Sequence, residues 1–172
     1  MIRVETDASV DWDSRTDWAK LADAAVRAAV EASAHAPLID SGIAVEVSVK
    51  LSSDAEVEGL NGAYRGKQKP TNVLSFPMFD AASLRAVAAA AGGEALLGDV
   101  ILAYGVCSRE AGDKKVAMDE HAAHLIVHGT LHLLGYDHET GEADAEAMEE
   151  TERRALAAIG ISDPYQVTEV QT

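Results

Sequence analysis

Alternation of apolar and polar residues predicts four short strands along the chain. Residues 2–6 alternate, and residues 43–51 alternate strictly and are rich in valine, which indicates a strand with one buried face. Residues 71–76 lie between two prolines and contain β-branched and aromatic side chains, so we expect a short strand near a sheet edge. Residues 96–103 have the same strand character and complete a sheet of about four strands.

Apolar positions three and four residues apart, preceded by capping residues, predict several helices. They are expected from caps at residues 11–14 to about Ala34, from caps at residues 52–54 to about Gly62, and over residues 108–115, 118–134 and 141–159. Gly135 and Gly160 follow the last two helices, and glycine is common at helix C-termini.

The stretch 81–93 differs in composition from its surroundings. Seven alanines occur between Ala81 and Ala91, followed by Gly92 and Gly93, so we expect an insert or surface loop with helical turns. The 172 residues have the length of one domain, and the elements follow no regular βα rhythm. The sequence therefore predicts a single α+β domain over residues 1–172, with a mixed sheet of about four strands and several helices.

Net charge restricts the partners that the protein can bind electrostatically. The 29 acidic and 14 basic residues give a formal net charge of −15, which argues against binding nucleic acid or an anionic membrane through bulk electrostatics. Seven acidic residues and no basic residue occur within residues 139–152, so we expect the last helix to present a solvated acidic face. Charges beyond about 8 Å are largely screened, so a nucleic acid would have to be recognised locally, and one of arbitrary sequence would bind weakly.

Cysteine content and hydropathy exclude further classes of protein. Cys107 is the only cysteine, which excludes an internal disulfide and a cysteine-based zinc ribbon, and we expect it to be a small core residue. We find no run of about 18 apolar residues and no secretory signal pattern, so we expect a cytoplasmic protein without a membrane partner.

Histidines concentrate in one short part of the chain. Five of the six lie between His121 and His138, and His128 and His132 are four residues apart in a predicted helix, which places both imidazoles on one face. Gly135 ends that helix, so the chain can turn and return His138 to the same point. Three imidazoles with an open fourth position are typical of catalytic zinc. We therefore predict one Zn²⁺ per chain, held by His128, His132 and His138.

The same segment matches the zinc-protease pattern H-E-x-x-H-x-x-G-x-x-H except at the glutamate. Gly129 occupies the place of that glutamate, which acts as the general base in the proteases. Peptide hydrolysis by that mechanism is therefore disfavoured, unless a carboxylate from elsewhere in the fold takes over.

Three neighbouring residues have open roles. His121 and His124 lie on the same helical stripe as His128, and we expect them to line the groove or to be solvated, with support of a ligand as the alternative. Asp137 either orients an imidazole or stabilises the turn after the helix.

The eleven residues 128–138, HGTLHLLGYDH, resemble the signature of the YbeY family of bacterial metal-dependent endoribonucleases. Residues 64–77, YRGKQKPTNVLSFP, and residues 97–102, LGDVIL, look like two further blocks of that family. The resemblance extends over residues 60–160, and the first 40 residues and the alanine-rich stretch contribute little to it. Gln68 is a departure, because the family often has aspartate there, but it is not a ligand position.

The resemblance implies a single-domain α+β fold, zinc held by the three histidines, and an endoribonuclease acting on single-stranded RNA. It also implies maturation of ribosomal RNA, especially the 3′ end of the small-subunit RNA, and ribosome quality control, with the small subunit or its assembly factors as partners.

Three basic residues in the second block are candidates for contacts with RNA. Arg65 is the catalytic candidate that would stabilise charge developing on the phosphate, with a surface ion pair as the alternative. Lys67 and Lys69 either bind RNA phosphates or belong to a solvated turn.

Two other functions remain open from the residues alone. A zinc hydrolase acting on peptides or small molecules would need a general base in place of Gly129. A non-catalytic ribosome-assembly factor with a structural metal would need a fourth protein ligand.

Overall fold

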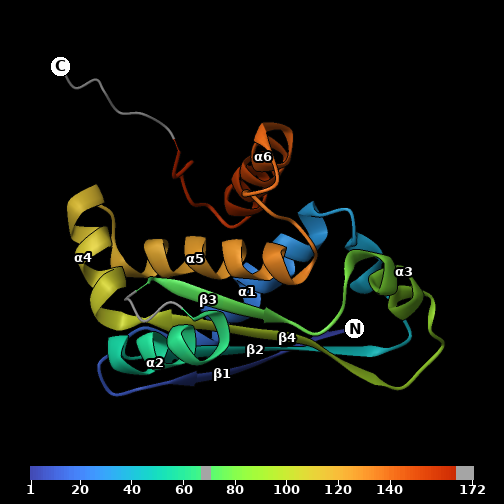
Figure 1. Cartoon of the computed structure of the whole chain (residues 1–172), viewed down its shortest axis with the longest axis horizontal. Coiled ribbons are helices and arrows are strands. Elements are labelled where there is room, and N and C mark those ends of the chain that lie inside the picture. Colours follow the sequence, from blue (N-terminus) through green and yellow to red (C-terminus); the bar gives the residue numbers. More distant parts are fainter. Residues whose placement is uncertain (67–70, 166–172) are drawn as a thin grey trace.

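Strands and helices follow one another along the chain in the order seen in Figure 1. The computed structural model describes residues 1–66 and 71–165, except the side chain of Arg65. The elements are β1 (Ile2–Ala8), α1 (Trp18–Ala32), the 3-10 helix η1 (Ala36–Leu38), β2 (Ala44–Ser52), α2 (Asp54–Arg65), β3 (Val73–Pro77), α3 (Ala81–Ala89), β4 (Glu94–Ala103), α4 (Tyr104–Lys114), α5 (Met118–Leu133) and α6 (Glu142–Ala158).

The four strands form one mixed sheet in the order β1-β2-β4-β3. β1 pairs parallel with β2, β2 pairs parallel with β4, and β3 pairs antiparallel with β4. The predicted four-stranded mixed sheet of an α+β fold is therefore confirmed. β3 lies at an edge, as its flanking prolines predict, because proline cannot donate a hydrogen bond to a neighbouring strand.

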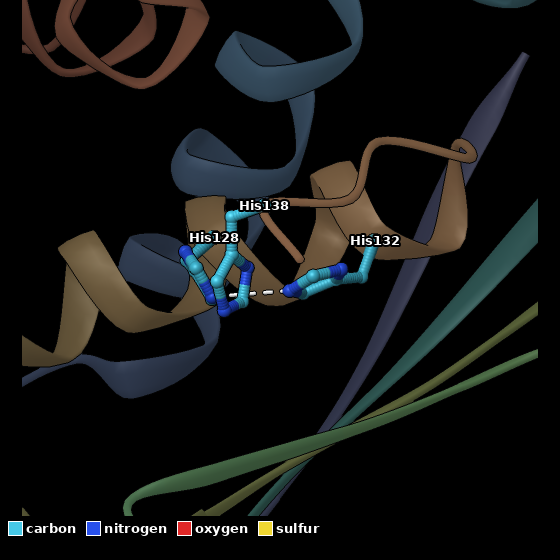
Figure 2. Close-up of side chains that lie close together, drawn as sticks. All are labelled: His128, His132 and His138. Atoms are coloured by element: carbon cyan, nitrogen blue, oxygen red, sulfur yellow. Dashed lines mark hydrogen bonds between the residues drawn. The ribbon is translucent and has the colours of Figure 1, made fainter. Parts of the chain in front are cut away.

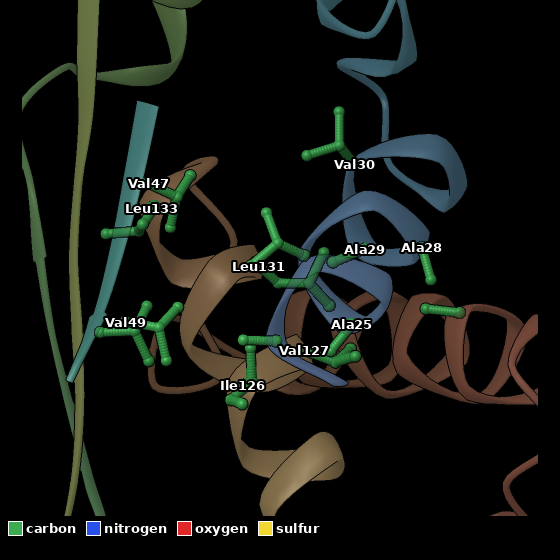
Figure 3. Packing of buried hydrophobic residues seen from close by; sticks show 14 of the residues in the cluster. Ala25, Ala28, Ala29, Val30, Val47, Val49, Ile126, Val127, Leu131 and Leu133 are labelled. Carbon is green, nitrogen blue, oxygen red and sulfur yellow. The ribbon is translucent and has the colours of Figure 1, made fainter. Parts of the chain in front are cut away.

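One face of the sheet carries most of the core. The alternating residues Val45, Val47, Val49 and Leu51 of β2 are buried there, and α1 and α5 cover them, with α6 packed on the outside (Figure 1). Small alanines on α1 allow α5 and α6 to approach closely, as Figure 3 shows around Ala25, Ala28 and Ala29. This three-layer packing fixes the position of α5, the helix that carries most of the histidines.

The opposite face of the sheet has a smaller apolar cluster. Val57 of α2 packs there on Leu74 of β3 and on Ile101 and Ala103 of β4. α2 thus lies across the sheet from α5 (Figure 1). The element that ends at Arg65 therefore belongs to a different layer from the histidine helix.

The first long helix begins later than the sequence predicts. α1 starts at Trp18, and its N-cap is Asp17, whose side chain accepts a backbone hydrogen bond at 3.1 Å. Residues 11–14, the predicted caps, do not start a helix, and Trp12 among them is buried. Its Nε1 donates to the carbonyl of Ser52, and its ring packs edge-on against Trp18. Burial of a large aromatic side chain has overridden the local capping signal.

The alanine-rich stretch 81–93, expected as an insert or loop with helical turns, contains a capped helix. α3 begins after Asp80, whose carboxylate accepts a hydrogen bond from the backbone N–H of Ser83 at 2.8 Å. Leu84 is fully buried and attaches this helix to the core. A cap and one buried leucine are enough to order a segment that composition alone describes as a loop.

The remaining helices match their predictions with shifts at the ends. α2 continues to Arg65 rather than Gly62, and α4 begins at Tyr104, directly after β4, rather than at residue 108. α5 and α6 have the predicted ends within two residues, the range over which helix boundaries normally vary.

Cys107 lies in the core, as the sequence predicts. Cys107 is fully buried in the core, and burial raises the pKa of its thiol to about 12, so it is an inert core residue. Over the ranges 1–66 and 71–165, none of the helices has the length and apolar character needed to cross a bilayer.

A β-bulge in β4 brings α5 close to the sheet. The register with β2 shifts so that Glu46 pairs with Leu96 and Val47 with Gly98, which leaves Leu97 as an extra residue, fully buried. Gly98 has a φ of 153°, and a Cβ there would collide with the Phe76 carbonyl and lie 2.7 Å from Leu133 of α5. Only glycine allows this strand and this helix to meet so closely.

We predict that Gly98→Ala destabilises the protein by about 3 kcal/mol, because the backbone strain and the collision add together. Gly59→Ala is the matched control, since Gly59 lies inside α2 with open space at its Cβ position. In the control, the free energy of unfolding should rise by about 1 kcal/mol, because alanine has a higher helix propensity than glycine. Urea unfolding of both variants measures the difference, and equal stabilities would show that the close approach at Gly98 is not required.

Candidate metal centre

Three imidazoles from two neighbouring segments converge on one point. His128 and His132 lie one turn apart on α5, and His138 reaches back from the loop that precedes α6 (Figure 2). The Nε2 atoms of His128 and His132 are 3.1 Å apart, and one nitrogen of each of the three rings lies within 4.8 Å of the others. Tetrahedral zinc with Zn–N bonds of 2.0–2.1 Å places its nitrogens about 3.4 Å apart, so the spacing fits a shared ion.

The turn after α5 delivers His138 to this point. Gly135 has a φ of 95°, a left-handed conformation that ends the helix, and Tyr136 donates its backbone N–H to the carbonyl of Leu131 at 3.0 Å. The Tyr136 hydroxyl accepts a hydrogen bond from the backbone of Ala34 at 3.0 Å and so ties the turn to the end of α1. The helix-stop glycine therefore has the predicted effect.

Hydrogen bonds determine which ring nitrogens face the centre. His132 donates from Nδ1 to the Tyr136 carbonyl at 2.9 Å, and His128 donates from Nδ1 to Oε1 of Glu152 at 3.1 Å. A neutral ring with its proton on Nδ1 has a bare lone pair on Nε2. Two such lone pairs therefore face each other across 3.1 Å (Figure 2), an arrangement that a cation stabilises.

Burial favours the neutral, metal-binding form of His132. Desolvation lowers the pKa of His132 to about 4, with a further contribution from the charge of His128. The ring is therefore neutral at pH 7 and available as a ligand.

A tetrahedral metal ion held by these three histidines would have one coordination position left for a further ligand. Within the two described ranges, these histidines are the one group of three or more His, Cys, Asp or Glu side chains that is close enough to share a metal. His128 and His132 are half-buried, whereas His138 is exposed. The arrangement can hold a metal ion while presenting it to solvent or substrate, as catalytic sites require.

His121 and His124 are buried, so the expectation that they are solvated is wrong. His121 contacts Glu110 through Nε2 at 2.8 Å, and His124 contacts Glu152 through Nε2 at 2.9 Å. Both also line a pocket of about 840 Å³ between the α4–α5 turn and residues 161–164, but His128, His132 and His138 do not line it, so it is not a groove at the three-histidine group. The carboxylate partners hold these rings in the interior, because buried polar groups require hydrogen bonds.

Glu152 is the residue of this site that sequence reasoning missed. The acidic run 139–152 was expected to be a solvated face, yet Glu152 is fully buried and contacts two histidines. The signal was its position four residues after Met148 and three before Ala155, which places it on the buried stripe of α6. The prediction is therefore wrong at this position, because helical periodicity outweighs local charge.

The packing of α5 on β4 explains why residue 129 is a glycine, and it also excludes one catalytic residue from this position. A Cβ at this position would lie 2.7 Å from Cγ1 of Val100 on β4. Val100 is fully buried and β-branched, so it cannot easily move. A glutamate would not fit between α5 and the sheet, and the protease general base is excluded from this position by packing.

The structure shows a role for Asp137 but not for the three basic residues that the sequence predicts to contact RNA. Asp137 accepts a hydrogen bond from the backbone N–H of Glu139 at 2.8 Å, so of its two proposed roles the structure shows the turn. Arg65 is the last residue of α2, but its side chain lies outside the described part, as do Lys67 and Lys69. Their roles stay predictions.

The chain is similar to known proteins in both sequence and fold. The sequence profile of the family described as Endoribonuclease YbeY matches residues 6–160. Proteins named Endoribonuclease YbeY from Rhizorhabdus wittichii and Novosphingobium aromaticivorans are 54% and 50% identical to this chain. These alignments cover 98% and 95% of this chain, and 99% and 96% of the relatives.

A solved structure shares the fold. The solution structure of TM1509 from Thermotoga maritima has a TM-score of 0.53 and 22% identity, and covers 96% of this chain and 99% of that one. Fold and site together define an α+β protein in which three clustered histidines could hold a metal ion. With the profile and the relatives, the chain belongs to the Endoribonuclease YbeY family.

We predict that the protein binds one Zn²⁺ per chain and that His132→Ala weakens this binding at least about 100-fold. Losing a ligand should exceed the 10–100-fold cost typical of losing an outer hydrogen-bond partner. His35→Ala is the control, because His35 is the one histidine outside the run 121–138. Competition with a chromophoric chelator measures both affinities. Equal zinc binding by His132→Ala and the wild type would contradict the ligand assignment.

Proposed function

We propose that this protein is a zinc-dependent endoribonuclease that cleaves single-stranded RNA. The proposed role is maturation of ribosomal RNA, particularly the 3′ end of the small-subunit RNA, and ribosome quality control. The observation that carries the proposal is the open three-histidine centre in a chain of the Endoribonuclease YbeY family. Relatives about 50% identical along nearly their whole length have the name of that activity.

The proposed ligands are His128, His132 and His138. When bound, zinc supplies Lewis-acid stabilisation of the negative charge that develops on a scissile phosphate. His128 and His132 hold their Nε2 atoms toward the ion because each donates its Nδ1 proton elsewhere. The exposed His138 leaves the centre accessible from solvent.

Basic residues near the end of α2 complete the proposal. Arg65 would stabilise developing charge on the phosphoryl oxygens, and Lys67 and Lys69 would contact flanking phosphates. Ribosomal RNA in the small subunit, or with its assembly factors, is the proposed partner. The cytoplasmic location and the single domain over residues 1–172 remain part of the same proposal.

The two alternative functions have less support. Packing of Gly129 against Val100 leaves no room for the glutamate of a zinc peptidase. A structural metal in an assembly factor requires four protein ligands, and the group that the described residues form has three.

RNA cleavage by the purified protein tests the proposal directly. We predict that the zinc-loaded wild type cleaves precursor small-subunit RNA and that His132→Ala loses at least about 100-fold in rate. His35→Ala should cleave like the wild type, and mapping of RNA ends with and without ribosomes shows whether the ribosome provides specificity. Intact RNA combined with peptide hydrolysis that is lost in His128→Ala would support the peptidase instead.

Charge reversal tests the role of Arg65 separately. We predict that Arg65→Glu lowers the cleavage rate about 100-fold or more while the fold and zinc affinity stay unchanged. Arg3→Glu is the matched control, because Arg3 lies in β1 at the far edge of the sheet, and among the described residues its side chain forms only an exposed ion pair with Glu94. Normal small-subunit RNA ends in cells with only the Arg65→Glu protein would contradict the assigned role.

A further inference from the structure

A buried carboxylate lies directly behind the metal centre. Glu152 of α6 is fully buried, with 1% of its side chain exposed. Its Oε1 accepts from Nδ1 of His128 at 3.1 Å, and its Oε2 accepts from Nε2 of His124 at 2.9 Å. The same carboxylate thus contacts one proposed zinc ligand and one histidine that is not a ligand.

A third donor comes from the C-terminal end of the described chain. The Tyr165 hydroxyl lies 3.1 Å from Oε1 and 2.9 Å from Oε2 of Glu152. Arg153 holds this segment, because it contacts Asp163 at 3.1 Å and lies 5.8 Å from the centre of the Tyr165 ring. Tyr165 therefore reaches the carboxylate from a segment anchored to the same helix.

Hydrogen bonds hold the carboxyl group of Glu152 in the interior. Its two oxygens meet one nitrogen of His124, one nitrogen of His128 and the Tyr165 hydroxyl. With three such partners around it, the carboxylate is the acceptor and both histidines donate to it. His124 then has its proton on Nε2, which agrees with Nδ1 of His124 having no hydrogen-bond partner among the described residues.

The consequence for His128 is geometric. Its ring is held at Nδ1, so Nε2 is left bare and points toward His132 and His138. We propose that Glu152, held by Tyr165, is the positioning residue of the metal centre, because it sets the tautomer and ring orientation of His128. The inference rests on the proposed metal site and adds two residues that do not touch the ion.

The energetic cost of this arrangement argues that it has a purpose beyond packing. A buried carboxylate loses its hydration, and an apolar side chain of similar size would fill the same space at lower cost. Carboxylates that accept from the far nitrogen of a metal-binding histidine fix the ring and make its other nitrogen more basic. Glu152 has this relation to His128, whereas the other acidic residues of α6 contact no proposed ligand.

Two variants of the full-length protein test the proposal. Glu152→Gln keeps the volume but faces one histidine with an amide N–H₂, so zinc affinity should fall about 10–100-fold. Tyr165→Phe keeps the carboxylate and removes one of its three hydrogen-bond donors, so we expect zinc affinity to fall roughly 3–10-fold. Glu146→Gln is the matched control, because Glu146 is exposed on the same helix. The zinc affinity of this variant should equal that of the wild type.

A second measurement separates positioning from stability. In metal-free protein with ¹⁵N-labelled histidine, the ring shifts should place the proton of His128 on Nδ1 in the wild type. In Glu152→Gln a substantial fraction should move to Nε2, the nitrogen proposed to bind zinc. Circular dichroism of the metal-free variants shows whether they are folded, and Tyr165→Phe supplies the result if Glu152→Gln does not fold.

Wild-type zinc affinity and wild-type His128 tautomer in folded Glu152→Gln would overturn the proposal, and so would unchanged affinity in Tyr165→Phe. Neither readout depends on RNA. A protein that shows both effects but leaves RNA intact would refute the proposed function while supporting this inference.

Discussion

The close packing of α5 on β4 is the constraint on which the rest of this structure depends. Gly129 on the helix and Gly98 on the strand leave no space for a Cβ, so the two elements meet with little tolerance. That contact sets the position and rotation of the helix, and hence the directions of His128 and His132. It also excludes an acidic side chain at position 129. One packing contact thus orients two of the three clustered histidines and leaves no room for the general base of the zinc proteases.

Behind the helix, buried polar groups connect the centre to the rest of the fold. Glu152 joins α6 to α5 and, through Tyr165, to the chain beyond α6. A charge in such a place is tolerated only because several donors surround it. The overall charge of −15 therefore has two different parts. Most carboxylates lie at the surface and are screened, whereas Glu152 acts at short range on two histidines.

Much of the fold was predictable, because strands and helices follow local periodicity. All four strands, the edge position of β3 and the long histidine helix agree with the pattern of apolar residues. The differences occur where a distant contact overrides a local signal. Trp12 is buried against Trp18 and Tyr104 and delays the start of α1, and buried Leu84 helps to order the alanine-rich stretch as α3. Neither contact can be read from neighbouring residues.

The sequence by itself determined the three-histidine group, since helical spacing and a helix-stop glycine bring His128, His132 and His138 together within one short segment. Only the tertiary structure decided what surrounds that group. The partner of His128 comes from a helix 24 residues further along the chain, and the reason for Gly129 lies in a strand on another layer. Spacing rules act within one segment, whereas burial and packing depend on which segments meet.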